Sequence, residues 1–144
     1  MNHYADSSFL VSCYVSDANT ARAKAYLGRL SVPLRFTALH ALEVRNALRL
    51  GVFRGLFAEA DAAAARANLE SDLRSGRLVR TKVKWPVALR LAALLSERHS
   101  ATIGTRSLDI LHVAVARSLR VGEFVTFDTR QRTLAAGIGL KVGP

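Results

Sequence analysis

Apolar residues recur at helical spacing along most of the chain, and short runs with strand character interrupt them. The pattern predicts helices at 17–30, 39–53, 57–75, 85–99, 105–119 and 129–136. It predicts strands at 3–5, 34–37, 78–83, 123–127 and 140–142. In the run 124–127, β-branched and aromatic residues follow one another without a helical period, which is typical of a strand. Strands alternating with helices predict an α/β fold whose parallel sheet is covered on both faces.

The chain has 144 residues, half of them hydrophobic, so it is long and apolar enough to form a folded core. We expect one domain over 1–144, because no repeat or linker composition divides the chain. Cys13 is the sole cysteine, which excludes an intramolecular disulfide and a cysteine-based zinc site. No export signal is visible, and the apolar stretch 87–95 is too short to span a membrane. We therefore expect a cytoplasmic protein without a membrane segment.

The chain is strongly basic, with 21 Lys and Arg against 11 Asp and Glu, a formal charge of +10. This excess favours a polyanionic partner such as nucleic acid. Codon bias is an alternative cause, because 17 of the cations are Arg and 23 residues are Ala. A basic run surrounds the predicted third strand and could track an RNA backbone or form a solvated face; it consists of Arg74, Arg77, Arg80, Lys82 and Lys84.

Four of the few acidic residues stand at unusual places. Asp6 and Asp128 each follow a predicted strand, whereas Glu43 and Asp109 interrupt apolar helical stretches. Burying an unpaired carboxylate costs roughly several kcal/mol, so such residues need partners. Ligands of parallel sheets bind at the carboxyl ends of the strands. We therefore expect the four carboxylates to meet at one edge of the sheet.

Each of these carboxylates also has a purely structural interpretation. Asp6 and Asp128 are candidate helix N-caps, and Gln131 would complete a capping-box pattern with the latter. Asp109 could pair with Arg106 one turn earlier, and the glutamate could lie exposed beside arginines of its own helix. These interpretations are weaker for the set of four than for each residue alone.

Four clustered carboxylates raise one another's pKa unless cations intervene. Mg²⁺ suits such a cluster, because it prefers oxygen ligands and shares them with substrate phosphates. Two such ions can activate water and stabilise the leaving oxygen of a phosphodiester, with no dedicated histidine base. The hypothesis from the residues is therefore a metal-dependent nuclease, with an acidic notch on a basic body.

The sequence resembles the PIN domain family over nearly its whole length and in the family's order. The resemblance is carried by 4–11 (YADSSFLV), 42–48 (LEVRNAL), 106–114 (RSLDILHVA) and 124–131 (FVTFDTRQ) with the following 134–140. Size and type look most like VapC-type toxins of bacterial toxin–antitoxin pairs. The resemblance implies a three-layer fold with a five-stranded parallel sheet between helices. It also implies an endoribonuclease that uses Mg²⁺ or Mn²⁺, forms a homodimer and is inhibited by a cognate antitoxin protein.

The resemblance assigns the catalytic and metal-site acids to Asp6, Glu43, Asp109 and Asp128. Asp6 and Asp109 are the strongest candidates for direct metal ligation, and the other two would act directly or through water. Ser8 and Thr126 match small hydroxyl positions beside these acids. Many relatives carry a further acid near the last motif; this chain has Thr129 and Arg130 after Asp128, which leaves one or two ions open.

Helical spacing adds three supporting candidates. Asn46 lies one turn after Glu43 and could hold it by a hydrogen bond. Arg106 precedes Asp109 by one turn and could orient it or contact phosphate, or simply form an ion pair. His112 follows Asp109 by one turn and is either near the site or a packed histidine.

Three other functions are alternatives. A dinucleotide-binding domain needs a glycine-rich turn after the first strand, where this chain has Asp6, Ser7 and Ser8. A non-catalytic nucleic-acid-binding or regulatory PIN-like module is the main alternative, and the presence of all four acids argues against it. A nuclease for structured DNA is the third. For the protein partners, apolar residues could provide a dimer or antitoxin groove or could equally be ordinary core; they are Phe53, Leu56, Phe57, Leu91, Leu94 and Leu95.

Overall fold

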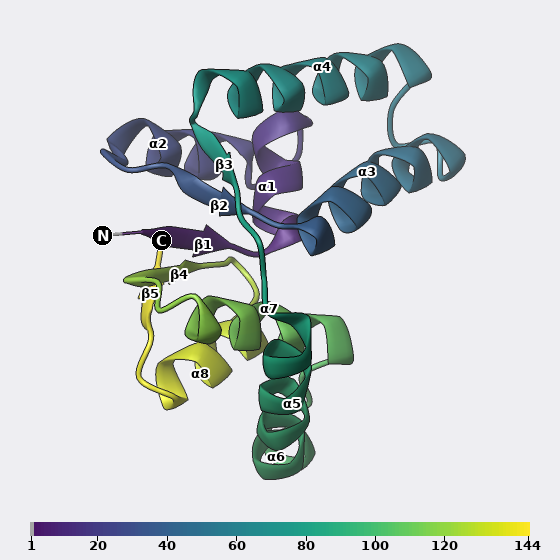
Figure 1. Ribbon diagram of the computed structural model, residues 1–144. Coiled ribbons are helices and arrows are strands. Elements are labelled where there is room, and N and C mark those ends of the chain that lie inside the picture. Colours follow the sequence, from purple (N-terminus) through teal and green to yellow (C-terminus); the bar gives the residue numbers. More distant parts are fainter. Residues whose placement is uncertain (1) are drawn as a thin grey trace. The chain divides into compact units, whose positions relative to one another are not determined.

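The computed structural model describes residues 2–144, in which short strands and helices alternate (Figure 1). The residues form two compact units, one of residues 2–6 with Lys82–Pro144 and one of Ser7–Thr81. Five parallel strands with flanking helices confirm the predicted α/β fold class. The single domain over 1–144 stays a prediction. No helix within residues 2–144 is both long and apolar enough to cross a lipid bilayer.

The first unit contains three parallel strands in the order β1 (His3–Ala5), β4 (Glu123–Val125) and β5 (Lys141–Gly143). The middle residue of β1, Tyr4, is in register with Phe124 of β4. Both rings are fully buried and stack with their centroids 6.1 Å apart. The aromatic pair anchors the two strands whose carboxyl ends carry the residues described below.

Helices complete this unit: α5 (Trp85–Leu95), a π-helical segment η1 (Ser96–Ser100), the short α6 (Ala101–Ile103), α7 (Ser107–Ser118) and α8 (Thr129–Gly137). Helix α7 packs against α5 and α8, and its residues 110–116 are all buried. It is therefore the central helix of the unit, and Asp109 lies in its first turn.

The second unit pairs β2 (Leu34–Phe36) with β3 (Leu78–Arg80) in parallel. Its helices are α1 (Ser7–Tyr14), α2 (Thr20–Arg29), α3 (Ala38–Phe53) and α4 (Glu59–Ser75). A core cluster of Leu48, Ala62 and Ala65 joins α3 to α4. The small alanines of α4 allow the close approach of the two helices.

Several elements differ from the sequence pattern, and three of these differences are the most informative. Helix α1 was not predicted, because it is only eight residues long and carries three serines, yet it buries Phe9 and Leu10 completely. The helix predicted at 17–30 is confined to Thr20–Arg29. The helix predicted at 85–99 stays α-helical only to Leu95 and continues as the π-helical segment, whose residues are all at least partly exposed. Because this segment has no buried face, its hydrophobic pattern does not show where the α-helix ends.

Candidate functional site

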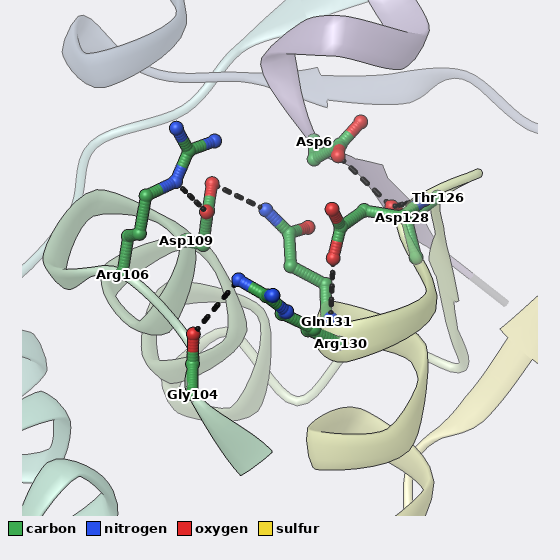
Figure 2. Close-up of polar contacts among 8 residues, drawn as sticks. All are labelled: Asp6, Gly104, Arg106, Asp109, Thr126, Asp128, Arg130 and Gln131. Atoms are coloured by element: carbon green, nitrogen blue, oxygen red, sulfur yellow. Dashed lines mark hydrogen bonds and ion pairs between the residues drawn. The ribbon is translucent and has the colours of Figure 1, made fainter. Parts of the chain in front are cut away.

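The first part of the site lies where β1 and β4 end. Asp6 follows β1, is 2 % exposed, and donates its backbone N–H to the Val125 carbonyl at 3.0 Å. Thr126 follows β4, is fully buried, and donates its backbone N–H to Gly143 at 2.8 Å. The sheet hydrogen bonds thus continue one residue beyond the strands and hold both side chains in place. The Thr126 hydroxyl donates to Asp6 Oδ2 at 2.9 Å (Figure 2).

The second carboxylate, Asp128, is fixed by the start of α8. Its backbone N–H donates to the Thr126 hydroxyl oxygen at 2.9 Å, so this hydroxyl connects Asp6 with Asp128. Its side-chain Oδ1 accepts from the backbone N–H of Gln131 at 2.7 Å. The predicted N-cap at Asp128 is therefore confirmed. The helix cap uses Oδ1 of Asp128. Because Asp128 follows the carboxyl end of β4, its side chain also lies beside the hydrogen-bonded Asp6 and Thr126 (Figure 2).

Gln131 joins α8 to α7. Its side chain is 2 % exposed, and its amide nitrogen Nε2 donates to Asp109 Oδ1 at 2.8 Å. The capping-box prediction is thus only half right, because the glutamine side chain does not return to the backbone of Asp128, whose N–H is already bound to Thr126. The amide oxygen Oε1 is buried and has no hydrogen-bond partner within residues 2–144. From the sequence pattern, only a capping role is predicted for Gln131.

Asp109 has a second, exposed partner. Arg106 Nε lies 3.2 Å from Asp109 Oδ2, with side-chain exposures of 82 % for the arginine and 21 % for the aspartate. A pair this open to water contributes about 0–1 kcal/mol, so the arginine can leave at little cost. Arg130 Nη1 donates to the Gly104 carbonyl oxygen at 3.3 Å (Figure 2). Arginine side chains such as these are frequent partners of phosphate groups.

Glu43 belongs to the unit of Ser7–Thr81. It is half-buried on α3, where its Oε1 accepts a hydrogen bond from Ser7 Oγ at 2.9 Å. The resemblance matches Ser8 to the small hydroxyl position beside the acids. Ser8 is exposed, whereas Ser7 is the buried serine that contacts the glutamate. Asn46, proposed to hold Glu43, is exposed on the same helix. The burial difference between Ser7 and Ser8 follows from the first turn of α1, which the sequence pattern did not predict.

His112 is a packed core residue. It is 1 % exposed, and its Nδ1 shares a hydrogen bond of 2.8 Å with the Tyr4 hydroxyl. The tyrosine is itself fully buried, so each group satisfies the other away from water. Of the two interpretations of His112, the structure supports the packed histidine.

Cys13 is equally structural. Its thiol donates to the Phe9 carbonyl at 3.3 Å within α1. Burial raises the pKa of the Cys13 thiol to about 12, so the group is protonated at neutral pH.

The basic run around β3 is partly neutralised. Arg77 Nη1 lies 3.5 Å from Asp72 Oδ1, and Arg80 Nη2 lies 3.4 Å from Glu70 Oε2. Both arginines remain about two-thirds exposed, at 66 % and 63 %. The run is therefore a solvated face that keeps part of its charge for a polyanion.

The donor set determines what the site could hold. Within residues 2–144, no group of three or more His, Cys, Asp or Glu side chains is arranged to hold a metal ion. Asp6, Asp128 and Asp109 are instead joined through one threonine and one glutamine. All available ligands are hard oxygens, and the unpartnered Oε1 of Gln131 adds a neutral one. These oxygen ligands fit a cation that keeps several of its water molecules, as Mg²⁺ usually does in proteins.

Comparisons with known proteins agree with this architecture. The family profile described as PIN domain matches residues 4–137. The structure of FitAcB from Neisseria gonorrhoeae is similar with a TM-score of 0.69 at 19 % identity, covering 99 % of this chain and 96 % of that one. VapC20 of Mycobacterium tuberculosis, described as a sarcin-ricin loop cleaving toxin, gives 0.68 at 18 % identity and covers 96 % and 95 %. PAE2754 from Pyrobaculum aerophilum gives 0.60 at 22 % identity and covers 99 % and 83 %. No curated protein matches the sequence significantly.

Proposed function

The chain belongs to the PIN domain family, and we propose that it is a metal-dependent endoribonuclease, the toxin of a type II toxin–antitoxin pair. One observation carries the proposal. Asp6, Asp128 and Asp109 come from three separate segments and are connected by hydrogen bonds through Thr126 and Gln131. These hydrogen bonds hold the side chains of Asp6 and Asp109 in fixed positions, which is the kind of support that a ligand-binding constellation needs.

The aspartates, together with Glu43, would hold Mg²⁺ or Mn²⁺. Such an ion supplies an activated water and neutralises charge on the phosphodiester when it is bound. Thr126 keeps Asp6 oriented, because its hydroxyl donates to Oδ2 at 2.9 Å. Arg106 is exposed and weakly paired, so it can turn from Asp109 to a phosphate of the substrate.

RNA is the proposed substrate. The similarity to VapC20, described as cleaving the sarcin-ricin loop, supports a ribonuclease. Net charge supports it as well, because setting aside the four proposed site acids leaves 21 cations against 7 other acids. The positive body would attract the RNA backbone, and the acidic site would require a cation before a phosphate could approach.

A protein partner is the second part of the proposal. Three large apolar side chains in the unit of Ser7–Thr81 are widely exposed: Phe53 at 86 %, Leu56 at 71 % and Leu42 at 66 %. Exposed apolar residues on α3 and the turn after it support a surface for the antitoxin or for a homodimer. The proposed place of action is the cytoplasm, where RNA and the antitoxin would meet the protein.

The proposal is tested with purified protein and end-labelled RNA in the presence of Mg²⁺, Mn²⁺ or EDTA. We expect cleavage by the wild type with either ion and none with EDTA. Asp6→Asn and Asp109→Asn should lose at least 100-fold in rate, since each removes a proposed ligand charge. Glu97→Gln is the matched control, because it removes an exposed acid outside the site and should cleave normally.

Two results would contradict this function. Cleavage by Asp6→Asn at the wild-type rate would remove the carboxylates from the mechanism. Wild-type protein that binds RNA with metal present, yet never cuts it, would favour the non-catalytic PIN-like module.

The toxin role has its own test. Expression of the wild type should arrest growth, whereas expression of Asp6→Ala should not. Co-expression of the product of the neighbouring gene, which is the expected antitoxin, should relieve the arrest.

A further inference from the structure

We propose that Gln131 is part of the cation site, with Nε2 holding Asp109 in place and Oε1 serving as a neutral oxygen ligand, direct or through one water. The inference rests on the proposed function, because it concerns the same divalent cation. It adds to the four acids a residue that the sequence pattern assigned only to helix capping.

The conformation of Gln131 is the first argument. Gln131 is the third residue of α8, where a side chain of this type usually returns to the backbone of the N-cap residue. Here the N-cap N–H, that of Asp128, is bound to the Thr126 hydroxyl at 2.9 Å. The glutamine side chain therefore extends away from its own helix to Asp109 on α7. Helix capping alone does not explain this conformation.

The orientation of the amide is the second argument. An ionised carboxylate only accepts hydrogen bonds, so the group that faces Asp109 Oδ1 at 2.8 Å must be the NH₂. Oε1 consequently turns from Asp109 toward the side of Asp128 and Asp6 (Figure 2). A flipped amide would place two acceptors against each other.

The missing partner of Oε1 is the third argument. Gln131 is 2 % exposed, and its Oε1 finds no donor within residues 2–144. Buried acceptors in folded proteins are nearly always satisfied, and one left open marks a place for a ligand, a water or an ion. The side toward which it turns carries carboxylates, which are acceptors too. A divalent cation with its shell of waters can satisfy these acceptors together.

Two substitutions separate the functions of the two amide atoms. Gln131→Met keeps the length of the side chain but removes the donor and the acceptor. Gln131→Glu removes the donor, keeps an oxygen at the position of Oε1 and places a second carboxylate beside Asp109. Mn²⁺ affinity is measured by isothermal titration calorimetry on the full chain, with circular dichroism as the check on folding.

We expect Gln131→Met to bind Mn²⁺ at least tenfold more weakly than the wild type. We expect Gln131→Glu to bind it at least as tightly as the wild type, because the variant keeps the oxygen ligand and its added charge, next to Asp109, favours a cation between them. Wild-type affinity in the methionine variant would overturn the proposal. Equal weakening in both variants would overturn it as well, because the oxygen would then make no contribution and only the donor to Asp109 would matter.

A measurement on the unmodified side chain covers the case in which Gln131→Met does not fold. Gln131 is the only glutamine of the chain, so protein labelled with ¹⁵N-glutamine shows a single side-chain NH₂ pair. Titration with Mg²⁺ should shift this pair along the same binding curve that calorimetry gives. A pair that stays in place while Mg²⁺ binds would show that Gln131 lies outside the site.

The same measurements distinguish the two proposals. Wild-type protein that binds no Mn²⁺ and cuts no RNA contradicts the proposed function and this inference together. Wild-type protein that binds Mn²⁺ and cuts RNA, with Gln131→Met unchanged in both, contradicts the inference alone.

Discussion

Thr126 connects two of the proposed ligands, and its replacement by valine removes that connection with almost no change of shape. The hydroxyl donates to Asp6 Oδ2 at 2.9 Å and accepts from the Asp128 N–H at 2.9 Å. Thr126→Val exchanges the hydroxyl for a methyl group, so both polar groups lose this partner. Thr126→Ser is the matched control, because it keeps the hydroxyl and loses only the methyl group.

The size of the effect follows from burial. Thr126 is fully buried and Asp6 is 2 % exposed, so water does not readily replace the lost contact. Leaving a buried donor or acceptor without its partner costs about 1–3 kcal/mol, with more for a charged group. Two such losses predict that Thr126→Val lowers the free energy of unfolding by about 2–4 kcal/mol. Removal of one buried methyl group in Thr126→Ser costs about 1 kcal/mol.

Urea denaturation followed by circular dichroism measures both variants, with unfolding slopes compared to establish that the same transition is seen. RNA cleavage should fall at least tenfold in Thr126→Val and stay near wild type in Thr126→Ser, because only the former releases Asp6. Equal stability of the two variants would refute the reasoning, since the hydroxyl would then contribute nothing beyond its volume.

The other predictions concern packing, a thiol and the polyelectrolyte character. Gly51→Ala should lower stability by about 1 kcal/mol, because a Cβ there would meet the ring of Phe57, whereas Gly28→Ala, with nothing within 4 Å, should raise it by a similar amount; equal melting temperatures would count against this. Burial raises the pKa of Cys13 to about 12, so native protein at pH 9 should react with iodoacetamide far more slowly than unfolded protein. Because folding raises the pKa of the Cys13 thiol, this group contributes its stabilisation fully below the ordinary value of 9.0. The stabilisation is lost as pH rises toward 12, which pH-dependent urea melts will show. The net charge of +10 attracts the RNA backbone, so the affinity for RNA should fall steeply between about 50 and 200 mM salt. An affinity that does not change with salt would exclude phosphate contacts as the basis of binding.

The sequence predicted elements whose pattern is local. Strand β4 lies in a run rich in aromatic and β-branched residues, and α3 and α7 have a clear helical period. The predicted positions of these elements therefore agree with the structure within two residues. The N-cap at Asp128 was also predictable, because the contact with Gln131 spans only three residues. Helix α1 escaped prediction because eight residues with three serines carry too short a pattern.

The sequence alone also indicated that the candidate site is built from carboxylates. Acids that follow strands or interrupt apolar helices need partners, whatever the arrangement of the strands and helices. Tertiary structure decided which partners they have. Asp6 and Thr126 are 120 positions apart, and they meet because β1 and β4 are adjacent and parallel. The packing of α7 against α8 brings the Gln131 side chain to Asp109. Its Oε1 then has no hydrogen-bond donor within residues 2–144. Periodicity and caps depend on residues three or four positions apart, whereas these contacts depend on strand order and on how α7 and α8 pack, so only the folded chain shows them.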